Sequence, residues 1–411
     1  MQDQWTKINK QTTSPPTPLT AFPAIQALHR THMHPKPNIR FATLKDTGEI
    51  NHLLGLAWFT QHSEAGWKWL FEDNPAQGEI PPGIVSIGKD GDLNGFVGCC
   101  IKRFSQNGET LTAMTGHSLV AHPNHLSAGF RLMVNLLHQK VGFGTYTLNN
   151  NEIAARIYPR ISQKAGYNNV PIFGQAARMS LQWITNPALQ IQAGLKRRYH
   201  IQTNFKTARN GVERFSTYTA PPTDKIKLPK YTSLIADHHQ HETALSLFWS
   251  RLSSNEGIFT YRDKATLDWI LSNPDAQTPP IFITYDRGDG IEGWLIGLIS
   301  KESEIAPPIL SIIDLIALPE SQNTILPELI SAARKIASKM KLMKVHLPYA
   351  SQETVKALEN CITPSNIKTT DYAHAHGCFY PPYRVEEFEK NWSPTPLDGD
   401  FSFCLRPMPI R

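Results

Sequence analysis

The sequence has few cysteines and no long apolar run. Its 411 residues include five cysteines, Cys99, Cys100, Cys361, Cys378 and Cys404, and no two of them form a CxxC pair. Scattered cysteines in an odd number argue against a disulfide framework or a structural zinc site, and they favour a reducing compartment. No stretch of 18 or more apolar residues is present, so we expect no transmembrane helix.

A secretory signal and a strong charge are also missing. The first ten residues, MQDQWTKINK, contain no apolar segment, so together with the cysteine content they predict a cytoplasmic protein. The net charge is only +6, from 41 Lys and Arg against 35 Asp and Glu. This balance suits an anionic ligand, but without a dense basic stripe it does not indicate DNA binding.

Histidine is plentiful, but its spacing does not predict a metal centre. The 16 histidines include the groups His238-His239-x-His241 and His374-x-His376. Neither group has partner cysteines or the HExxH spacing of a zinc enzyme. We therefore expect no metal site.

Composition and length predict two domains joined by a linker. Residues 1–37 are polar and rich in proline, which is typical of a disordered or loosely packed arm. A second polar stretch, 203–229, contains Ala-Pro-Pro-Thr-Asp and is the best linker candidate. The predicted domains are therefore 38–202 and 230–411, each near the usual size of a single domain.

The two predicted domains repeat the same landmarks. Trp69 followed by Asn74-Pro75 recurs as Trp269 followed by Asn273-Pro274. A turn-and-strand pattern, a strand ending in proline and a later strand also recur, with offsets of 196 to 200 residues. A period this long excludes a solenoid and predicts a tandem duplication. Each copy reads as strand, helices, three antiparallel strands, helix, strand, helix and strand, which is an α+β arrangement.

The segment Leu119–Leu132 contains the best candidate for a binding loop. An apolar run ends at Pro123, a short polar loop follows, and a helix with apolar periodicity begins near Arg131. The first N–H groups of a helix have no partner within the helix and form an anion site. Taken alone, the pattern favours an ordinary strand–turn–helix connection over an anion site.

The element order, with Val120-Ala121-His122-Pro123 leading into a loop and a helix, resembles the GNAT (GCN5-related N-acetyltransferase) superfamily, in particular its tandem bacterial members. The resemblance implies two GNAT-like domains, each a mixed, mostly antiparallel sheet flanked by helices. Leu126 stands where the family motif has Arg or Gln, Gly129 keeps the central glycine, and Arg131 takes the final Gly or Ala position. The implied residues of an acyl-CoA site are Leu119, Val120, Ala121, Leu126, Ser127, Ala128, Gly129, Phe130, Arg131 and Asn151.

The matching loop of the second copy departs further from the motif. Residues 319–324 contain no glycine, and Glu320 puts a negative charge where a diphosphate would lie. We expect this copy not to bind CoA, and to be structural or to border the acceptor site.

The resemblance also implies a chemistry. In the family an acceptor amine attacks the thioester of acyl-CoA directly, without a covalent enzyme intermediate. The spacing Asn151-x-x-Ala154-x-x-x-Tyr158 is similar to a family pattern and implies that Tyr158 is the general acid. His117, on the strand before the loop, is a candidate base at neutral pH, with Ser118 predicted on the opposite face. A packing tyrosine and a core histidine are the alternatives.

The leading hypothesis is an N-acyltransferase that uses acetyl-CoA or another acyl-CoA. Its expected acceptor is the amine of a small molecule or an amino sugar. Two alternatives remain open: a tandem GNAT transferase that uses aminoacyl-tRNA or an acyl carrier protein, and a non-catalytic binding or scaffold protein with this fold. The sequence does not indicate an oligomeric state.

Overall fold

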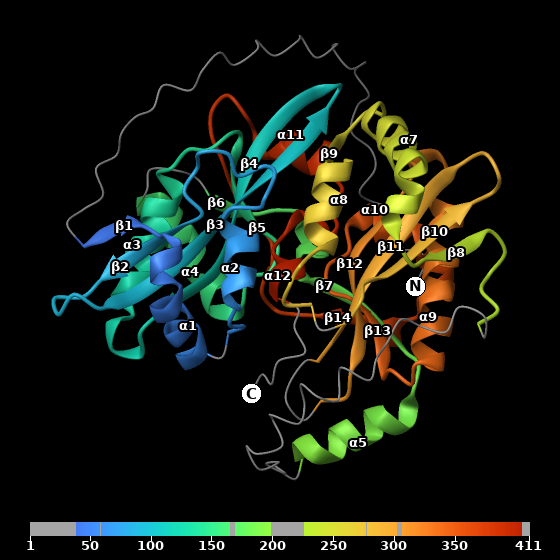
Figure 1. The fold of residues 1–411 in the computed structure, drawn as a ribbon, viewed down its shortest axis with the longest axis horizontal. Helices are drawn as coiled ribbons and strands as arrows, with labels where there is room; N and C mark the ends of the chain where they lie inside the picture. Colours follow the sequence, from blue (N-terminus) through green and yellow to red (C-terminus); the bar gives the residue numbers. More distant parts are fainter. Residues whose placement is uncertain are drawn as a thin grey trace, which may run out of the picture. The chain divides into compact units, whose positions relative to one another are not determined.

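A computed structural model describes residues 38–57, 59–164, 169–198, 226–276, 278–301 and 306–404. The predicted N-terminal arm and most of the predicted linker lie outside these residues. Within them, no helix is both long enough and apolar enough to cross a membrane. Figure 1 shows the arrangement of the elements, with the first half in blue to green and the second in yellow to red.

The first half contains a sheet with helices along it. Its elements are β1 (Ile39–Phe41), η1 (Leu44–Asp46), α1 (Thr47–Leu56), α2 (Glu64–Phe71), β2 (Gly83–Ile87), β3 (Leu93–Gln106), β4 (Glu109–Ala121), η2 (Pro123–His125), α3 (Ser127–Leu137), β5 (Gly144–Thr147), α4 (Glu152–Lys164), β6 (Asn169–Pro171), η3 (Gly174–Arg178), β7 (Met179–Ile184) and α5 (Pro187–Arg198).

The second half repeats this order and adds several short elements. It contains β8 (Thr232–Ile235), η5 (His238–His241), α7 (Glu242–Ser253), β9 (Ile258–Thr260), α8 (Lys264–Leu271), β10 (Ile281–Asp286), β11 (Ile291–Ser300), β12 (Ile309–Ala317), η6 (Pro319–Ser321), α9 (Gln322–Lys339), β13 (Lys344–Leu347), α10 (Gln352–Ala357), η7 (Glu359–Cys361), η8 (Pro364–Asn366), β14 (Ile367–Thr369), β15 (His376–Phe379), α11 (Val385–Asn391), η9 (Pro396–Asp398) and α12 (Phe401–Cys404).

The two sheets have the same strand plan. The first runs β1-β2-β3-β4-β5-β15-β6, with β9 paired to β3, and the second runs β8-β10-β11-β12-β13-β7-β14. Neighbours are antiparallel except for β4 with β5 and β12 with β13, which are parallel. This is the mixed, mostly antiparallel arrangement that the sequence predicts for each half.

The halves exchange strands, and besides the pairing of β9 with β3 each half inserts one strand between two strands of the other sheet. β7, from the first half, lies between β13 and β14 in the second sheet, and β15, from the second half, lies between β5 and β6 in the first. Sequence analysis does not predict this exchange, because strand order along the chain does not reveal which sheet a terminal strand joins. The linker predicted at 203–229 therefore separates two halves, and each sheet contains a strand from the other half.

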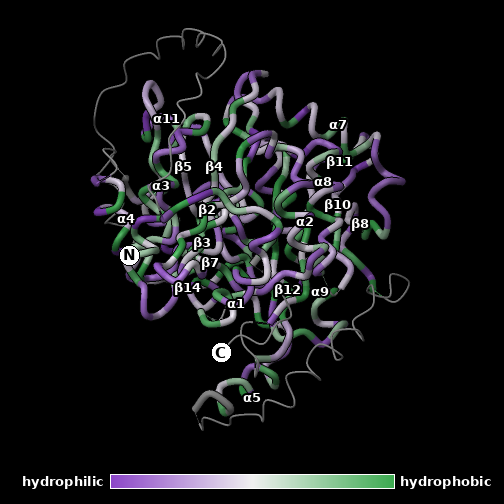
Figure 2. The backbone as a smooth tube through the Cα atoms, turned by 60° about the vertical axis from the view of Figure 1, so that its left-hand side comes forward, coloured by the Kyte–Doolittle hydropathy of each residue, from purple (hydrophilic) through white to green (hydrophobic). Residues whose placement is uncertain are grey.

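Each sheet is covered on both faces, which explains its long apolar strands. In β3, Gly95 lies against Leu132 of α3, whereas the next residue, Phe96, packs against Trp67 of α2. The second half repeats the pattern, with Gly293 against Ile325 of α9 and Trp294 against Phe248 of α7. Figure 2 shows apolar stretches along the central strands, with hydrophilic stretches in the peripheral loops.

The tryptophans that mark the repeat in the sequence meet in the structure. The rings of Trp69 and Trp269 stack with centroids 5.0 Å apart. The Trp69 indole N–H donates to the carbonyl of Trp269 at 2.6 Å, and the Trp269 indole N–H donates to the carbonyl of Trp69 at 3.0 Å. The two bonds mirror each other, so helices α2 and α8 pack about a local two-fold axis.

Candidate functional site

A cavity opens where β4 and β5 diverge. The two strands pair only through Met114 with Thr145 and Thr115 with Tyr146, and then separate. The cavity beyond this point has a volume of about 710 Å³. Most of its wall comes from 116–119 of β4, the end of β5 and the residues after it, helix α4, and the loop that ends at His62 before α2, with Val97 of β3 and Met133 of α3. Residues near the end of the described chain complete the wall, namely Tyr372, His374, Asp400 and Phe403.

A β-bulge shapes the β4 wall. The pairing of β3 with β4 shifts register between Phe96 and Gly98, and Ser118 has a φ of 52°. A bulge breaks the alternation of side chains along a strand. His117, Ser118 and Leu119 therefore all line the cavity. The prediction that Ser118 faces away from His117 is wrong for this reason.

His117 is a buried, neutral histidine. Its ring lies over Gly98, where an added Cβ would be 2.1 Å from the imidazole, and it packs edge-on against Phe403. Its Nδ1 is 3.2 Å from the hydroxyl of Ser118. Burial lowers the pKa of His117 to about 3. The ring is therefore uncharged at neutral pH, and it is a weak base because its conjugate acid is so strong.

Tyr158 is a buried, protonated tyrosine in the cavity wall. It lies in α4, is buried, lines the cavity and stacks on the ring of His376 with centroids 5.3 Å apart. Among the described residues, its hydroxyl has no hydrogen-bond partner. Burial raises the pKa of Tyr158, and the nearby charge of Asp400 raises it further. The phenol therefore stays protonated at neutral pH, and it gives up its proton less readily than an exposed tyrosine does.

Asn151 sets the start of the helix that carries Tyr158. Its side-chain oxygen accepts a hydrogen bond of 2.9 Å from the backbone N–H of Ala154, and its carbonyl accepts one from Ala155. This is an N-cap, which satisfies N–H groups that the helix cannot. Asn151 also lines the cavity, so the resemblance places it at the site, but its observed bonds serve to position α4.

The start of α3 offers free backbone donors. The residue before the helix, Leu126, makes no side-chain cap and is 73% exposed. Ser127, Ala128 and Gly129 form the first helical turn. Such a turn can bind an anion. An added Cβ at Gly129 would meet only the Cβ of Ala121, at an ordinary 3.6 Å, so the fold itself does not require glycine there.

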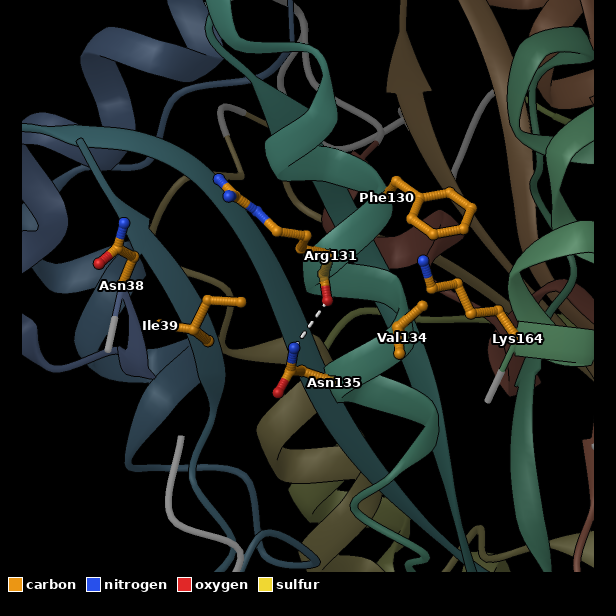
Figure 3. A pocket seen from close by; sticks show the side chains of 7 residues that line it. All are labelled: Asn38, Ile39, Phe130, Arg131, Val134, Asn135 and Lys164. Carbon is orange, nitrogen blue, oxygen red and sulfur yellow. Dashed lines mark hydrogen bonds between the residues drawn. The ribbon is translucent and has the colours of Figure 1, made fainter. Parts of the chain in front are cut away.

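The predicted CoA-site residues fall into separate places. Leu119 and Asn151 line the cavity, whereas Val120 is buried in the core and Ala121 lies beside α3. Phe130 and Arg131 line a different groove of about 370 Å³ on the outside of α3 (Figure 3). That groove also contains Lys164, whose ammonium lies 5.3 Å from the centre of the Phe130 ring. The structure therefore does not bring Phe130 and Arg131 to the cavity.

Sequence reasoning missed several residues of the cavity. His62 belongs to the loop before α2, and its Nδ1 is 3.1 Å from a carboxylate oxygen of Asp275 in the other half. Asp400 is the only acidic side chain among the described lining residues, which include no lysine or arginine. These residues carry no motif and lie hundreds of positions apart, so only the fold brings them together.

The matching place in the second half is filled with side chains. Asp314 of β12 accepts hydrogen bonds from Arg262, from the Trp294 indole at 2.8 Å and from Thr395 at 2.7 Å. Arg262 also lies 3.5 Å from Asp398. All these side chains are buried.

The histidine group His238-His239-x-His241, for which we expect no metal site from the sequence, lies directly before α7. Ligand atoms of Asp237, His238 and His239 lie within 4.8 Å of one another. However, Nε2 of His238 is 2.8 Å from Asp268, and Asp237 accepts a hydrogen bond from the backbone N–H of His239. Asp237 therefore already caps the helix start, and His238 already contacts the carboxylate of Asp268.

Comparison with known proteins adds evidence on the fold. No protein-family model and no curated protein sequence matches the chain. Among solved structures, Saccharomyces cerevisiae N-myristoyltransferase with bound myristoyl-CoA and inhibitors matches with a TM-score of 0.51 and 11% identity, over 86% of this chain and 81% of that one.

Two bacterial structures match less well. An Enterococcus faecalis protein described as a probable N-acyltransferase matches with a TM-score of 0.47, and a GCN5-related N-acetyltransferase from Anabaena variabilis with 0.46. Each is 13% identical and covers 82% of this chain and 71% of its own. Together with the strand order described above, the match to N-myristoyltransferase, with its TM-score of 0.51, confirms the GNAT-like α+β fold predicted from the sequence.

Proposed function

We propose that the chain is an N-acyltransferase that transfers an acyl group directly from acyl-CoA to an amine. The observation that carries this proposal is the cavity at the divergence of β4 and β5, with the protonated Tyr158 on one wall and the carboxylate of Asp400 on another. A proton donor and an anionic group around one cavity are what an amine acceptor and a thiolate leaving group require.

The residues present fit an acyl-CoA molecule. Beyond Thr115, β4 is not paired to β5, so its edge can accept an extended chain that contains amides. The uncapped first turn of α3, at the end of the same strand, suits a diphosphate. Apolar side chains line one part of the cavity and suit an acyl chain, among them Val97, Leu119, Met133, Ile153 and Ile157. Bound acyl-CoA supplies the activated thioester.

The lining also suggests the class of acceptor. Asp400 is the only fixed charge among the described lining residues, and it is negative. An ammonium group is attracted to such a site, whereas a phosphate or carboxylate beside the amine is repelled. We therefore propose a small amine or an amino sugar without a neighbouring anionic group, as in the sequence-based hypothesis.

Acyl-CoA binding tests the proposal directly. Titration calorimetry with acetyl-CoA and with longer acyl-CoAs should give saturable binding and rank the acyl lengths. Gly129→Glu should weaken binding on the order of tenfold or more, about 1.4 kcal/mol, because it adds negative charge at the first turn of α3. Gly129→Ala is the matched control and should bind normally, since its Cβ meets only ordinary contacts. Absence of binding by the unaltered chain would overturn the proposal.

A further inference from the structure

We propose that His62 is the general base that removes the proton from the acceptor amine, and that Asp275 of the other half positions it. This inference rests on the proposed function. The candidate base from the sequence, His117, is a weak base because of its burial. His62 lines the same cavity, within electrostatic range of His117.

The backbone of His62 is fixed by one side chain. The amide of Asn51, in α1, donates to the carbonyl of His62 at 2.7 Å, and its oxygen accepts from the N–H of His62 at 3.0 Å. The same oxygen accepts from the Trp67 indole, and the Trp67 ring packs edge-on against the imidazole at 4.7 Å. A catalytic side chain needs this kind of support to keep its geometry.

The ring of His62 is fixed from the second half. Its Nδ1 is 3.1 Å from a carboxylate oxygen of Asp275, and the two side chains are only 2% and 10% exposed. Asp275 also accepts from the backbone N–H of Ser63. An added Cβ at Gly66 would lie 1.9 Å from the Asp275 carboxylate, so the absence of a side chain at Gly66 makes room for this contact.

The pairing gives His62 the properties of a base. A carboxylate at Nδ1 holds the proton on that nitrogen, makes Nε2 the basic nitrogen, and stabilises the imidazolium that forms. Asp275 follows Asn273-Pro274, the landmark of the second copy. The second half therefore supplies a positioning residue to the site in the first half.

The proposed step balances in atoms and charge. The nitrogen of the neutral amine attacks the thioester carbon, a C–N bond forms, and the C–S bond breaks. The proton of the attacking nitrogen passes to Nε2 of His62 and then to solvent. The CoA thiolate takes the proton of Tyr158, which is restored from solvent. The products are an amide and CoA thiol.

The experiment measures CoA release from an acyl-CoA by thiol titration, with a panel of primary amines or with water as acceptor, and binding of the same acyl-CoA by calorimetry. His62→Ala should lower kcat on the order of 10²- to 10⁴-fold with unchanged acyl-CoA binding. Added imidazole should restore part of the rate, which a purely structural role would not allow.

Two further variants keep the inference testable if His62→Ala folds poorly. Asp275→Asn keeps the shape of the contact but not the charge, and should lower kcat while the KM for acyl-CoA stays unchanged. Gly66→Ala should lower kcat in the same way by displacing the carboxylate. Asp73→Asn, at an exposed carboxylate paired with Lys68, is the matched control and should keep full activity.

The outcomes separate the inference from the function on which it rests. Full activity of His62→Ala or Asp275→Asn, in a chain that binds acyl-CoA, overturns the inference alone. Loss of acyl-CoA binding in folded His62→Ala overturns it too, because it assigns His62 to binding. An unaltered chain that binds no acyl-CoA and releases no CoA overturns the proposed function and this inference with it.

Discussion

His62 and Arg262 stand 200 residues apart, at matching positions just before the helices that carry Trp69 and Trp269. Both side chains are buried and reach toward the fourth strand of their own sheet. His62 lines an open cavity and is held by one carboxylate. Arg262 lies in a closed network with two carboxylates, Asp314 and Asp398.

The difference shows how matching positions of one fold can border an open cavity in one half and form a closed network in the other. A guanidinium stays charged at any ordinary pH, so it needs buried partners and fills the space with them. An imidazole can remain neutral, so it leaves the cavity without a fixed positive charge. The second half still contributes to the cavity of the first, because Tyr372, His374, Asp400 and Phe403 line it and Asp275 contacts His62.

The largest expected effect tests the closed network. Arg262→Met should lower the free energy of unfolding by about 3–5 kcal/mol, because it leaves buried carboxylates without their cation. Chemical denaturation measures the loss. Lys264→Met, two positions away at an exposed ion pair, should leave the unfolding midpoint nearly unchanged. Equal effects of the two variants would mean that the network does not support the second half.

Acid should destabilise the first sheet through two of its buried histidines, His117 of β4 and His376 of β15. Burial lowers the pKa of His117 to about 3 and that of His376 to about 4. The unfolded chain binds protons at these histidines below about pH 6.5, whereas the folded chain does not. Stability should therefore fall between pH 6.5 and pH 4, by about 1.4 kcal/mol per pH unit for each histidine.

Urea unfolding at a series of pH values measures that slope. His117→Asn should make the slope shallower by the contribution of one bound proton. Arg262 does not titrate in this range and adds nothing to the slope. An unchanged slope in the variant would show that His117 is already charged in the folded chain.

A smaller effect concerns the shape of the cavity. Gly98→Ala should destabilise the fold by about 1–3 kcal/mol, because its Cβ would overlap the His117 ring. His117→Ala makes room for that Cβ, so the double variant should lose less than the sum of the single variants. Simple additivity in a double-mutant cycle would contradict the observed contact.

The smallest effect tests the symmetry between the halves. Trp69→Phe and Trp269→Phe each remove one indole N–H donor from a mirrored pair. Each should cost about 0.5–1.5 kcal/mol, with nearly equal values for the two variants. Calorimetric melting compares them, and a strongly unequal pair would show that the local two-fold axis does not extend to the energetics.

Local patterns in the sequence predict most of the fold. The order of strands and helices in each half follows the predicted order, because apolar periodicity and turn residues mark the elements. Between β6 and β7, however, Gly174–Arg178 forms a 3₁₀ helix. Phe173 just before this helix and Gly174, its first residue, both have positive φ values that no local pattern in the sequence reveals.

The site was less predictable because it depends on long-range contacts. The spacing from Asn151 to Tyr158 identified two residues that do line the cavity. Arg131 was assigned by its place in a loop motif, but α3 begins at Ser127, and the helix turns Arg131 to the outer groove. His62, Asp275 and Asp400 carry no local signature, since their roles depend on contacts across the exchanged halves.

The strand exchange determines what happens when the chain is cut between its two halves. β15 hydrogen-bonds along β5, which borders the cavity, and also holds β6, whereas β7 holds β13 and β14. A cut between residues 198 and 226 would leave each fragment carrying the strand that the other needs. We expect the two fragments to reassemble as a split protein and neither to be stable alone, so each half depends on the other for its fold.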